Sequence, residues 1–162
     1  MDITTPVIIA WHNEISRMVG DFRALNNYTK ADYYPIPRID HSLHNLSKSN
    51  YITTMDILKG FHQIVISENS RKFLRITCHL GVSEYSRIPF GIKNAPSHFQ
   101  RMMDSILGTF IRQGWMMVYI DDIFVYSNTW SEHLEKIRLV LEKIASSGLK
   151  ISIQKCILDM EN

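Results

Sequence analysis

The sequence predicts an α+β domain in which two amphipathic helices back an antiparallel sheet. Strand-like and helical segments are mixed along the chain instead of alternating regularly, which argues against a parallel α/β sheet. Several strand-like runs are paired across short polar turns, and two longer segments carry apolar residues at helical spacing. With 162 residues, 45% of them hydrophobic, the chain is long enough for one domain with a core.

The first part of the chain predicts a hairpin, an irregular segment and a short helix. Residues 7–11 and 17–22 are strand-like and flank a polar turn at 12–14. Two prolines hold part of 26–37 extended, and apolar residues at helical spacing then predict a helix over about 39–47.

The next part predicts further strands. Residues 51–55 form a β-rich run that ends at Asp56, and residues 64–66 are again strand-like. Residues 73–78 and 82–88 are alternating runs, which predict a second hairpin around the intervening turn.

A long amphipathic helix is expected after these strands. Asn94 can cap its N-terminus, and Pro96 is tolerated in a first helical turn because no intrahelical N–H is needed there. Seven apolar residues fall on one face, so the helix should pack on the sheet: Phe99, Met102, Met103, Ile106, Leu107, Phe110 and Ile111.

Two adjacent carboxylates, Asp121 and Asp122, interrupt the apolar run 116–127 and predict the turn of a hairpin. One interpretation is that both are only turn formers, because Asp tolerates turn geometry well. However, two anions at the tip of a buried hairpin repel each other and lose hydration, and a divalent cation would relieve both costs. Asp56 is a candidate third carboxylate, although a lone Asp at a strand end is more often a turn residue. We expect Asp56 and the Asp121–Asp122 hairpin to lie on neighbouring strands.

The C-terminal part predicts a capped helix and a last strand. Thr129 and Glu132 have the spacing of a capping box, and Gly148 stands where a left-handed residue ends a helix. Residues 149–153 predict a strand, with Lys155 just beyond it. The buried stripe of the helix is expected to contain Leu134, Ile137, Val140, Leu141 and Ile144.

The composition argues against several classes of protein. A net charge of +2 is too weak to identify a nucleic-acid binder, so such a function must rest on local sites. Cys78 and Cys156 stand far apart without partners at zinc spacing. The seven His are scattered, and we expect each to be a surface or satisfied core residue. Because the chain has neither an apolar run near 18 residues nor a signal-peptide pattern, we expect a soluble intracellular protein without membrane contact.

Six motifs in this order resemble the reverse transcriptases of long-terminal-repeat retrotransposons, particularly the group related to gypsy elements. The resemblance covers nearly all of the chain, from about residue 6 to residue 156. The motifs are RMVGDFRALN at 17–26, YPIPRID at 34–40, MDILKGFHQI at 55–64, PFGIKNAPSHFQ at 89–100, YIDD at 119–122 and GLKISIQKC at 148–156.

The resemblance implies a right-hand polymerase fold of which this chain holds two parts. The fingers would comprise about 1–50 and 62–90, and the palm about 51–61 and 91–162. We expect the thumb, connection and RNase H domains to be absent from the chain, which stops before the hairpin that grips the primer in the family. Poor processivity, or none, is therefore expected of this chain alone.

The resemblance also implies a magnesium site. Asp56 and Asp121 would ligate two Mg²⁺ ions, for which Mn²⁺ can substitute, and Asp122 would support the site or bind one ion less directly. Phosphoryl transfer needs one metal to activate the primer 3′ hydroxyl and another to neutralise the leaving pyrophosphate, with the ions about 3.5–4 Å apart. Mg²⁺ prefers carboxylate oxygens and keeps water and phosphate as its remaining ligands.

Further roles follow from the resemblance for residues that would bind dNTP. Arg17 matches an arginine that lies against the triphosphate, where a planar guanidinium suits phosphate. Phe61 matches an aromatic residue under the deoxyribose that would clash with a 2′ hydroxyl, although a core aromatic is the alternative. Ile57 and Phe90 complete this set, and Lys155 matches a lysine that would protonate pyrophosphate, with a solvated Lys as the alternative.

Template or primer contacts are implied for Gly91, Gln100, Tyr119 and Arg23, and Gly91 would permit a close backbone approach. The implied partners are a primed RNA or DNA template, dNTP and the remaining polyprotein domains, namely thumb, connection, RNase H and integrase. The implied location is a cytoplasmic virus-like particle, with a nuclear phase. The family usually has a Lys cluster where residues 10–15 read AWHNEI, and its loss would weaken triphosphate and template binding.

Three hypotheses for function stay open at this point. The first is an RNA-directed DNA polymerase that transfers dNTP to a primer 3′ hydroxyl, as a fragment of a retrotransposon polyprotein. The second is a catalytically silent remnant that binds nucleic acid or a partner protein. The third is another palm polymerase, such as an RNA-dependent RNA polymerase, which the sugar selection of Phe61 would distinguish.

Overall fold

The computed structural model describes residues 4–12, 15–37 and 47–160, and the chain forms two compact units. The first unit comprises Met1–Tyr33 and Phe61–Pro96, and the second comprises Tyr34–Gly60 and Ser97–Asn162. Most of the helix predicted over 39–47 lies outside the described residues. The predicted fingers and palm boundaries stay predictions.

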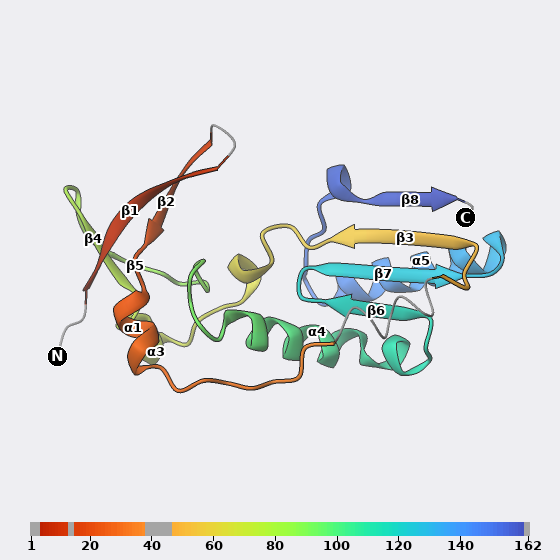
Figure 1. Cartoon of the computed structure of the whole chain (residues 1–162), viewed down its shortest axis with the longest axis horizontal. Coiled ribbons are helices and arrows are strands. Elements are labelled where there is room, and N and C mark those ends of the chain that lie inside the picture. Colours follow the sequence, from red (N-terminus) through yellow and green to blue (C-terminus); the bar gives the residue numbers. More distant parts are fainter. Residues whose placement is uncertain (1–3, 13–14, 38–46, 161–162) are drawn as a thin grey trace. The chain divides into compact units, whose positions relative to one another are not determined.

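The first unit contains a four-stranded sheet with the order β2-β1-β4-β5 (Figure 1). Both predicted hairpins are present, since β1 pairs antiparallel with β2 and β4 pairs antiparallel with β5. The two hairpins are joined by a parallel pairing of β1 with β4. The strands are β1 (Thr4–His12), β2 (Ile15–Gly20), β4 (Arg75–Cys78) and β5 (Gly81–Glu84).

The core of the first unit is a cluster of buried apolar side chains from Phe22, Ile66, Leu74 and Ile76. Short helical turns surround it: α1 (Arg23–Tyr28), η1 (Gly60–Gln63), whose first residue belongs to the second unit, and α3 (Glu68–Arg71). The prediction that the segment from residue 26 is irregular is wrong up to Tyr28, because α1 covers it. Helices of four to six residues have too few turns to show an apolar stripe, which is why periodicity did not reveal α1 and α3.

The second unit is an antiparallel sheet with helices packed on it, as the sequence predicts. Its strands lie in the order β6-β7-β3-β8, and Figure 1 shows α5 behind them. The elements are β3 (Tyr51–Asp56), α4 (Ala95–Arg112), β6 (Met116–Tyr119), β7 (Asp122–Ser127), α5 (Trp130–Ser146), η2 (Ile153–Lys155) and β8 (Ile157–Met160). Among the helices of the described residues, none combines the length and apolarity needed to cross a membrane.

The predicted stripe of α4 is confirmed at its centre, where Phe99, Met103 and Leu107 are fully buried. Asn94, however, uses its side chain to hold the segment that follows α1: its Oδ1 accepts from the Asp32 N–H at 3.1 Å, and its Nδ2 donates to the Lys30 carbonyl at 2.8 Å.

The predicted stripe of α5 is partly wrong. Val140 and Ile144 are buried as expected, but Leu134 and Leu141 are exposed, and the fully buried residue of the first turn is His133. The His133 ring lies 2.8 Å from Thr53 Oγ1 and 3.2 Å from Ser127 Oγ, so hydroxyl groups on β3 and β7 supply its hydrogen bonds. This polar pairing rotates the buried face of α5 away from the leucines.

The end of α5 follows the prediction, but the last strand does not. Gly148 has φ +73°, and hydrogen bonds from Gly148 N–H to Ala145 O and from Leu149 N–H to Ile144 O close the helix end. The strand predicted over 149–153 is wrong: that segment pairs only at an Ile57–Ile151 bridge and then turns into η2, while the strand β8 follows later.

Candidate active site

Asp56 and Asp122 face each other on neighbouring strands, as the sequence predicts. Asp56 ends β3, Asp122 begins β7, and the two are direct partners in the antiparallel register. Direct cross-strand partners lie on the same face of a sheet. The next residues along, Met55 and Ile123, point to the opposite face and are almost completely buried. The register therefore places both carboxylates on the face away from this core layer.

The turn of the central hairpin is shifted by one residue from the prediction. Tyr119 pairs with Asp122, so the two turn residues are Ile120 and Asp121, and Asp122 belongs to the strand. Ile120 has φ +53°, a conformation that a β-branched side chain strongly disfavours. Such a residue costs about 1–3 kcal/mol and persists only where the surrounding structure holds it.

Asp121 is a poorly solvated carboxylate. Within the described residues its Oδ1 is buried without a hydrogen-bond partner. The pKa of Asp121 is raised to about 6, chiefly by burial and then by the charges of Asp56 and Asp122, while the charge of Lys155 lowers it. Burial, followed by the charge of Asp56, also raises the pKa of Asp122. The charged forms of Asp121 and Asp122 are therefore disfavoured without a bound metal ion, as the metal hypothesis requires.

Gly60 makes room for Asp121. A Cβ atom built on Gly60 would overlap Asp121 Oδ1 and lie within 2.8 Å of the Phe99 ring. The MDILKG motif therefore contributes two features to this site, the Asp56 carboxylate and the space beside Asp121. Sequence reasoning did not identify this role, although the position of Gly60 inside a motif was the signal.

Lys155 lies at the same site, because η2 brings its Nζ to 3.1 Å from Asp56 Oδ2. Two backbone hydrogen bonds place this segment beside the end of β3: Ser152 N–H donates to Asp56 O at 2.8 Å, and Leu58 N–H donates to Lys150 O at 2.9 Å. The Lys155 side chain is 67% exposed, so the cation remains accessible to solvent while it neutralises part of the carboxylate charge.

The donor set suits a hard divalent cation but is not complete. Among the described residues, no group of three or more His, Cys, Asp or Glu side chains is arranged so that it could hold a metal ion. Mg²⁺ is usually bound in proteins by one or two carboxylates together with water and substrate phosphate. Clustered carboxylates with a buried oxygen lacking a partner fit that mode of binding.

Two other predicted residues of the second unit contact the central hairpin from inside the protein. Ile57 is 1% exposed, and its N–H donates to the Asp121 carbonyl at 3.0 Å. Gln100, on α4, is fully buried and hydrogen-bonds to the hairpin. Tyr119 is half-buried beside the turn.

The first unit brings Phe61 and Phe90 together, with ring centroids 5.9 Å apart in an edge-to-face arrangement. His62 packs on the same Phe90 ring at 4.8 Å, and its Nδ1 lies 3.0 Å from the Ile88 carbonyl. Gly91 follows with φ +88°, which favours glycine.

Asn26 secures this turn, a role that sequence reasoning missed although the residue ends the first motif. Its Nδ2 donates to the Gly91 carbonyl at 2.7 Å, and its Oδ1 accepts from the Lys93 N–H at 2.9 Å. The first and fourth motifs thus meet within the first unit.

The two predicted arginines also lie in the first unit. Arg17 is in β2, where its backbone lies opposite that of Ala10. The structure does not describe the side chain of Arg17. Arg23 is highly exposed and forms a two-pronged pair with Asp21, with Nη2–Oδ2 at 2.6 Å and Nε–Oδ1 at 2.8 Å. The roles predicted for both residues stay predictions.

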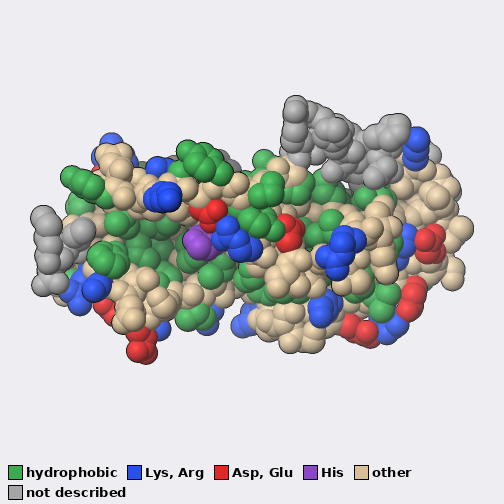
Figure 2. Space-filling model, turned by 90° about the horizontal axis from the view of Figure 1, so that it is seen from below, with side chains coloured by type: hydrophobic (Ala, Val, Ile, Leu, Met, Phe, Trp, Pro, Cys, Tyr) green, Lys and Arg blue, Asp and Glu red, His purple; other side chains and the backbone are tan. Residues whose placement is uncertain are grey.

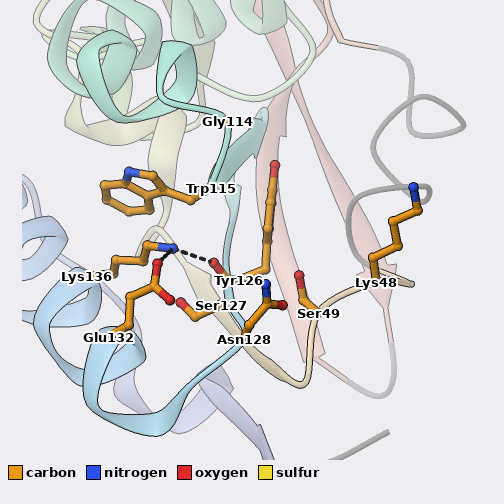
Figure 3. A pocket seen from close by; sticks show the side chains of 9 residues that line it. All are labelled: Lys48, Ser49, Gly114, Trp115, Tyr126, Ser127, Asn128, Glu132 and Lys136. Carbon is orange, nitrogen blue, oxygen red and sulfur yellow. Dashed lines mark hydrogen bonds and ion pairs between the residues drawn. The ribbon is translucent and has the colours of Figure 1, made fainter.

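A separate pocket of about 230 Å³ lies at the other end of β7 from Asp122 (Figure 3). Its walls come from the segments before β3 and β6, the end of β7 and the first turns of α5. Lys136 in this pocket pairs with Glu132 at 2.7 Å, donates to the Tyr126 carbonyl at 3.1 Å, and lies 5.2 Å from the Trp115 ring. These contacts join α5 to the sheet and pair the two charges that α5 contributes to the pocket, whose lining also contains Lys48.

Figure 2 shows that Lys and Arg side chains are interspersed with Asp and Glu on the face that it presents. This mixed surface agrees with the small net charge of +2. Long-range attraction from that face is therefore weak, and recognition must come from local groups.

Comparison with known proteins identifies the relatives of the chain. The family described as "Reverse transcriptase (RNA-dependent DNA polymerase)" matches residues 9–160. The Drosophila melanogaster retrovirus-related Pol polyprotein from transposon 297 is 44% identical over 140 residues, and that from transposon gypsy is 38% identical over 146 residues. The matches cover 86% and 90% of this chain but only 13% and 14% of the polyproteins.

Solved structures show the same fold. The foamy viral protease-reverse transcriptase in complex with an RNA/DNA hybrid has a TM-score of 0.87 and 27% identity, and covers 96% of this chain and 21% of its own. The same kind of protein in complex with double-stranded DNA has a TM-score of 0.86 and 25% identity, over 99% of this chain and 33% of its own.

The fold is that of a right-hand polymerase, with its fingers and palm, as the sequence predicts. The family match then shows the closer relationship: the chain belongs to the reverse transcriptase family. The predicted resemblance to gypsy-like retrotransposon polyproteins is likewise confirmed. Members of this family generally use divalent metal ions. The chain spans about one seventh or less of the length of the polyproteins reported above.

Proposed function

We propose that this chain is the nucleotidyl-transfer core of an RNA-directed DNA polymerase encoded in a retrotransposon polyprotein. It would add dNTP to a primer 3′ hydroxyl on an RNA or DNA template. The observation that supports this proposal is the cluster of Asp56, Asp121 and Asp122, in which the pKa of Asp121 is raised to about 6. A folded chain accepts such mutual repulsion where a cation or a charged substrate relieves it.

In this proposal Asp56 and Asp121 would hold two Mg²⁺ ions. Asp122, the cross-strand partner of Asp56, would support them from the start of β7. Bound Mg²⁺ would activate the primer hydroxyl and neutralise the charge on the leaving pyrophosphate. Lys155, whose Nζ lies 3.1 Å from Asp56, would donate a proton to the leaving pyrophosphate. Mn²⁺ would serve in place of Mg²⁺.

The proposed substrate groups of the first unit are Phe61 and Phe90, whose packed rings form an apolar surface suited to a deoxyribose. Gly91 would let the backbone approach the template strand closely, because no Cβ stands in the way. Phosphate contacts are proposed for Arg17 and Arg23. The remaining polyprotein domains would supply further contacts with template and primer, and we propose that the chain works within a cytoplasmic virus-like particle.

A single-nucleotide addition assay tests this proposal without depending on processivity. The chain is incubated with an RNA template, a labelled DNA primer, one matching dNTP and Mg²⁺ or Mn²⁺. We expect extension of the primer by one nucleotide, with a loss of about a hundredfold or more in Asp121→Asn. Template binding without any extension, and without an effect of Asp121→Asn, would instead support a catalytically silent remnant.

A further inference from the structure

Gln100 is a polar side chain placed in the core of the second unit. It lies on the sheet-facing side of α4, one residue after the buried Phe99, and has no solvent exposure. A buried carboxamide is costly unless its donors and acceptor are all paired. Its hydrogen bonds therefore indicate what the residue does.

The carboxamide of Gln100 bonds to β6 and to the first residue of the turn that follows it. Its Oε1 accepts from the Ile120 N–H at 2.9 Å, and its Nε2 donates to the Val118 carbonyl at 3.1 Å. The second Nε2 hydrogen is directed to Asp104 Oδ1 at 3.0 Å. Reversing the amide would place its oxygen against two acceptors, so these contacts define a single orientation.

A second layer holds Gln100 itself. Asp104 lies one helical turn further along α4, and its other oxygen, Oδ2, accepts from the Tyr34 hydroxyl at 2.7 Å. The Arg101 guanidinium lies over the Tyr34 ring, 4.6 Å from its centroid, in a cation–π contact. A chain of contacts thus runs from the second motif through α4 to the turn.

The turn needs such support at Ile120. This residue has φ +53°, which its β-branched side chain disfavours, and the bond from its N–H to Gln100 acts at that point. On the other side, the Asp121 carbonyl accepts from the Ile57 N–H at 3.0 Å. The first bond holds the peptide unit before the strained residue, and the second holds the peptide unit between Asp121 and Asp122.

We infer that Gln100 is a positioning residue for the polymerase site: it keeps Ile120 in the left-handed conformation that presents Asp121 and Asp122. The inference rests on the proposed function, because the presented carboxylates matter as metal ligands. It assigns Gln100 a different role from the template or primer contact that the family resemblance implied. A fully buried side chain with all polar atoms engaged cannot reach a nucleic-acid strand without breaking these bonds.

The most direct test is amide hydrogen exchange at Ile120, measured by NMR on the whole chain. We expect this amide to be protected in the wild type and to exchange at least about tenfold faster in Gln100→Met, which has a similar size but no amide. The Val125 amide in the β3–β7 region serves as an internal reference and should stay protected. An Ile120 amide that exchanges equally slowly in both proteins would overturn the inference.

Mn²⁺ titration of the same proteins tests the consequence for the carboxylates. Loss of a residue that orients metal ligands typically lowers metal affinity by about 10- to 100-fold, and we expect a decrease in this range for Gln100→Met. Unchanged affinity would show that the turn presents its carboxylates without Gln100. If the wild type binds no Mn²⁺, the proposed function fails, whereas the exchange comparison still decides whether Gln100 holds the turn.

Matched variants separate positioning from general destabilisation. Gln113→Met removes a glutamine just after α4 whose Oε1 accepts from the Trp115 indole N–H, and it should leave both measurements unchanged. Adding Ile120→Gly to Gln100→Met should restore much of the Mn²⁺ affinity, since glycine adopts positive φ without strain. If Gln100→Met does not fold, Tyr34→Phe removes only the outer support, and unchanged Ile120 exchange in that variant would contradict the proposed chain of contacts.

Discussion

At the scale of single residues, we propose Phe61 as the side chain that distinguishes the sugar of the substrate. Its ring packs edge-to-face on Phe90 and remains half-buried, so it is held in place but still presents a surface. This arrangement suits an aromatic wall that a 2′ hydroxyl would strike.

We therefore expect Phe61→Ala to raise the use of rNTP relative to dNTP by about tenfold or more, which is the range for one steric contact in an apolar pocket. Single-nucleotide addition with each nucleotide measures the ratio. Phe73→Ala, which truncates an exposed phenylalanine of the same unit, is the control. An unchanged ratio in a folded Phe61→Ala chain would make Phe61 a core aromatic only.

Gly60 offers a second test at a residue that carries no functional group. Because a Cβ there would overlap the Asp121 carboxylate, Gly60→Ala should displace that group. Overpacking of this kind costs about 1–3 kcal/mol of stability, and we expect Mn²⁺ affinity to fall about tenfold or more.

Gly108→Ala is the matched control for Gly60→Ala, because its added Cβ would approach only the flexible end of Arg112 at 3.2 Å. It should leave Mn²⁺ affinity unchanged, and the alanine favours the helix. Equal Mn²⁺ affinity in Gly60→Ala and the wild type would show that Asp121 can bind the ion without the space that the missing Cβ of Gly60 leaves beside it.

At the scale of elements, α5 is fastened to the sheet by His133. The ring lies between the hydroxyls of Thr53 and Ser127, and burial lowers its pKa, with the Lys136 charge adding to the effect and Glu132 opposing it. The neutral ring is therefore the form that the folded chain prefers.

This pKa shift predicts how stability depends on pH. Since the pKa of His133 is lower in the folded than in the unfolded chain, its contribution is complete above the unfolded value of about 6.5 and is lost as pH falls below it. Urea unfolding midpoints should decrease from pH 7.5 to 5.5, and decrease less in His133→Gln, which keeps the hydrogen bonds without titrating. His98→Gln, at an exposed position of α4, should behave as the wild type. Equal slopes for His133→Gln and the wild type would contradict this account.

The elements show what sequence patterns could and could not predict. The hairpins and the two long helices follow from alternation, helical spacing and the Gly148 stop, and all are present. The buried face of α5 did not follow from apolar spacing, because His133 finds partners on β3 and β7 that are distant in sequence.

The central turn shows the same limit at the site. The sequence predicted Asp121 and Asp122 as turn residues and Asp56 on a neighbouring strand, but it did not predict the register that pairs Asp56 with Asp122. No local rule predicts Ile120 at positive φ, since the stabilising bond comes from Gln100, twenty residues earlier in the chain. The space beside Asp121 likewise depends on Gly60, which only the fold brings there.

At the scale of the whole molecule, the chain combines a weak net charge with carboxylates gathered at the end of β3 and the start of β7. Its charge of +2, and the mixed charges on the face that Figure 2 presents, provide little general attraction for nucleic acid. The carboxylates at the end of β3 and the start of β7 are therefore the feature on which the proposed activity depends. Membership of the reverse transcriptase family agrees with that emphasis.

The central claim is that Asp56, Asp121 and Asp122 form a divalent-cation site, and titration with Mn²⁺ followed by electron paramagnetic resonance tests it most directly. We expect saturable binding to the wild-type chain that tightens when dNTP is added and falls about tenfold or more in Asp56→Asn. Circular dichroism confirms that both proteins are folded. A folded wild type that binds no Mn²⁺, or binds it as well as Asp56→Asn does, would contradict the account.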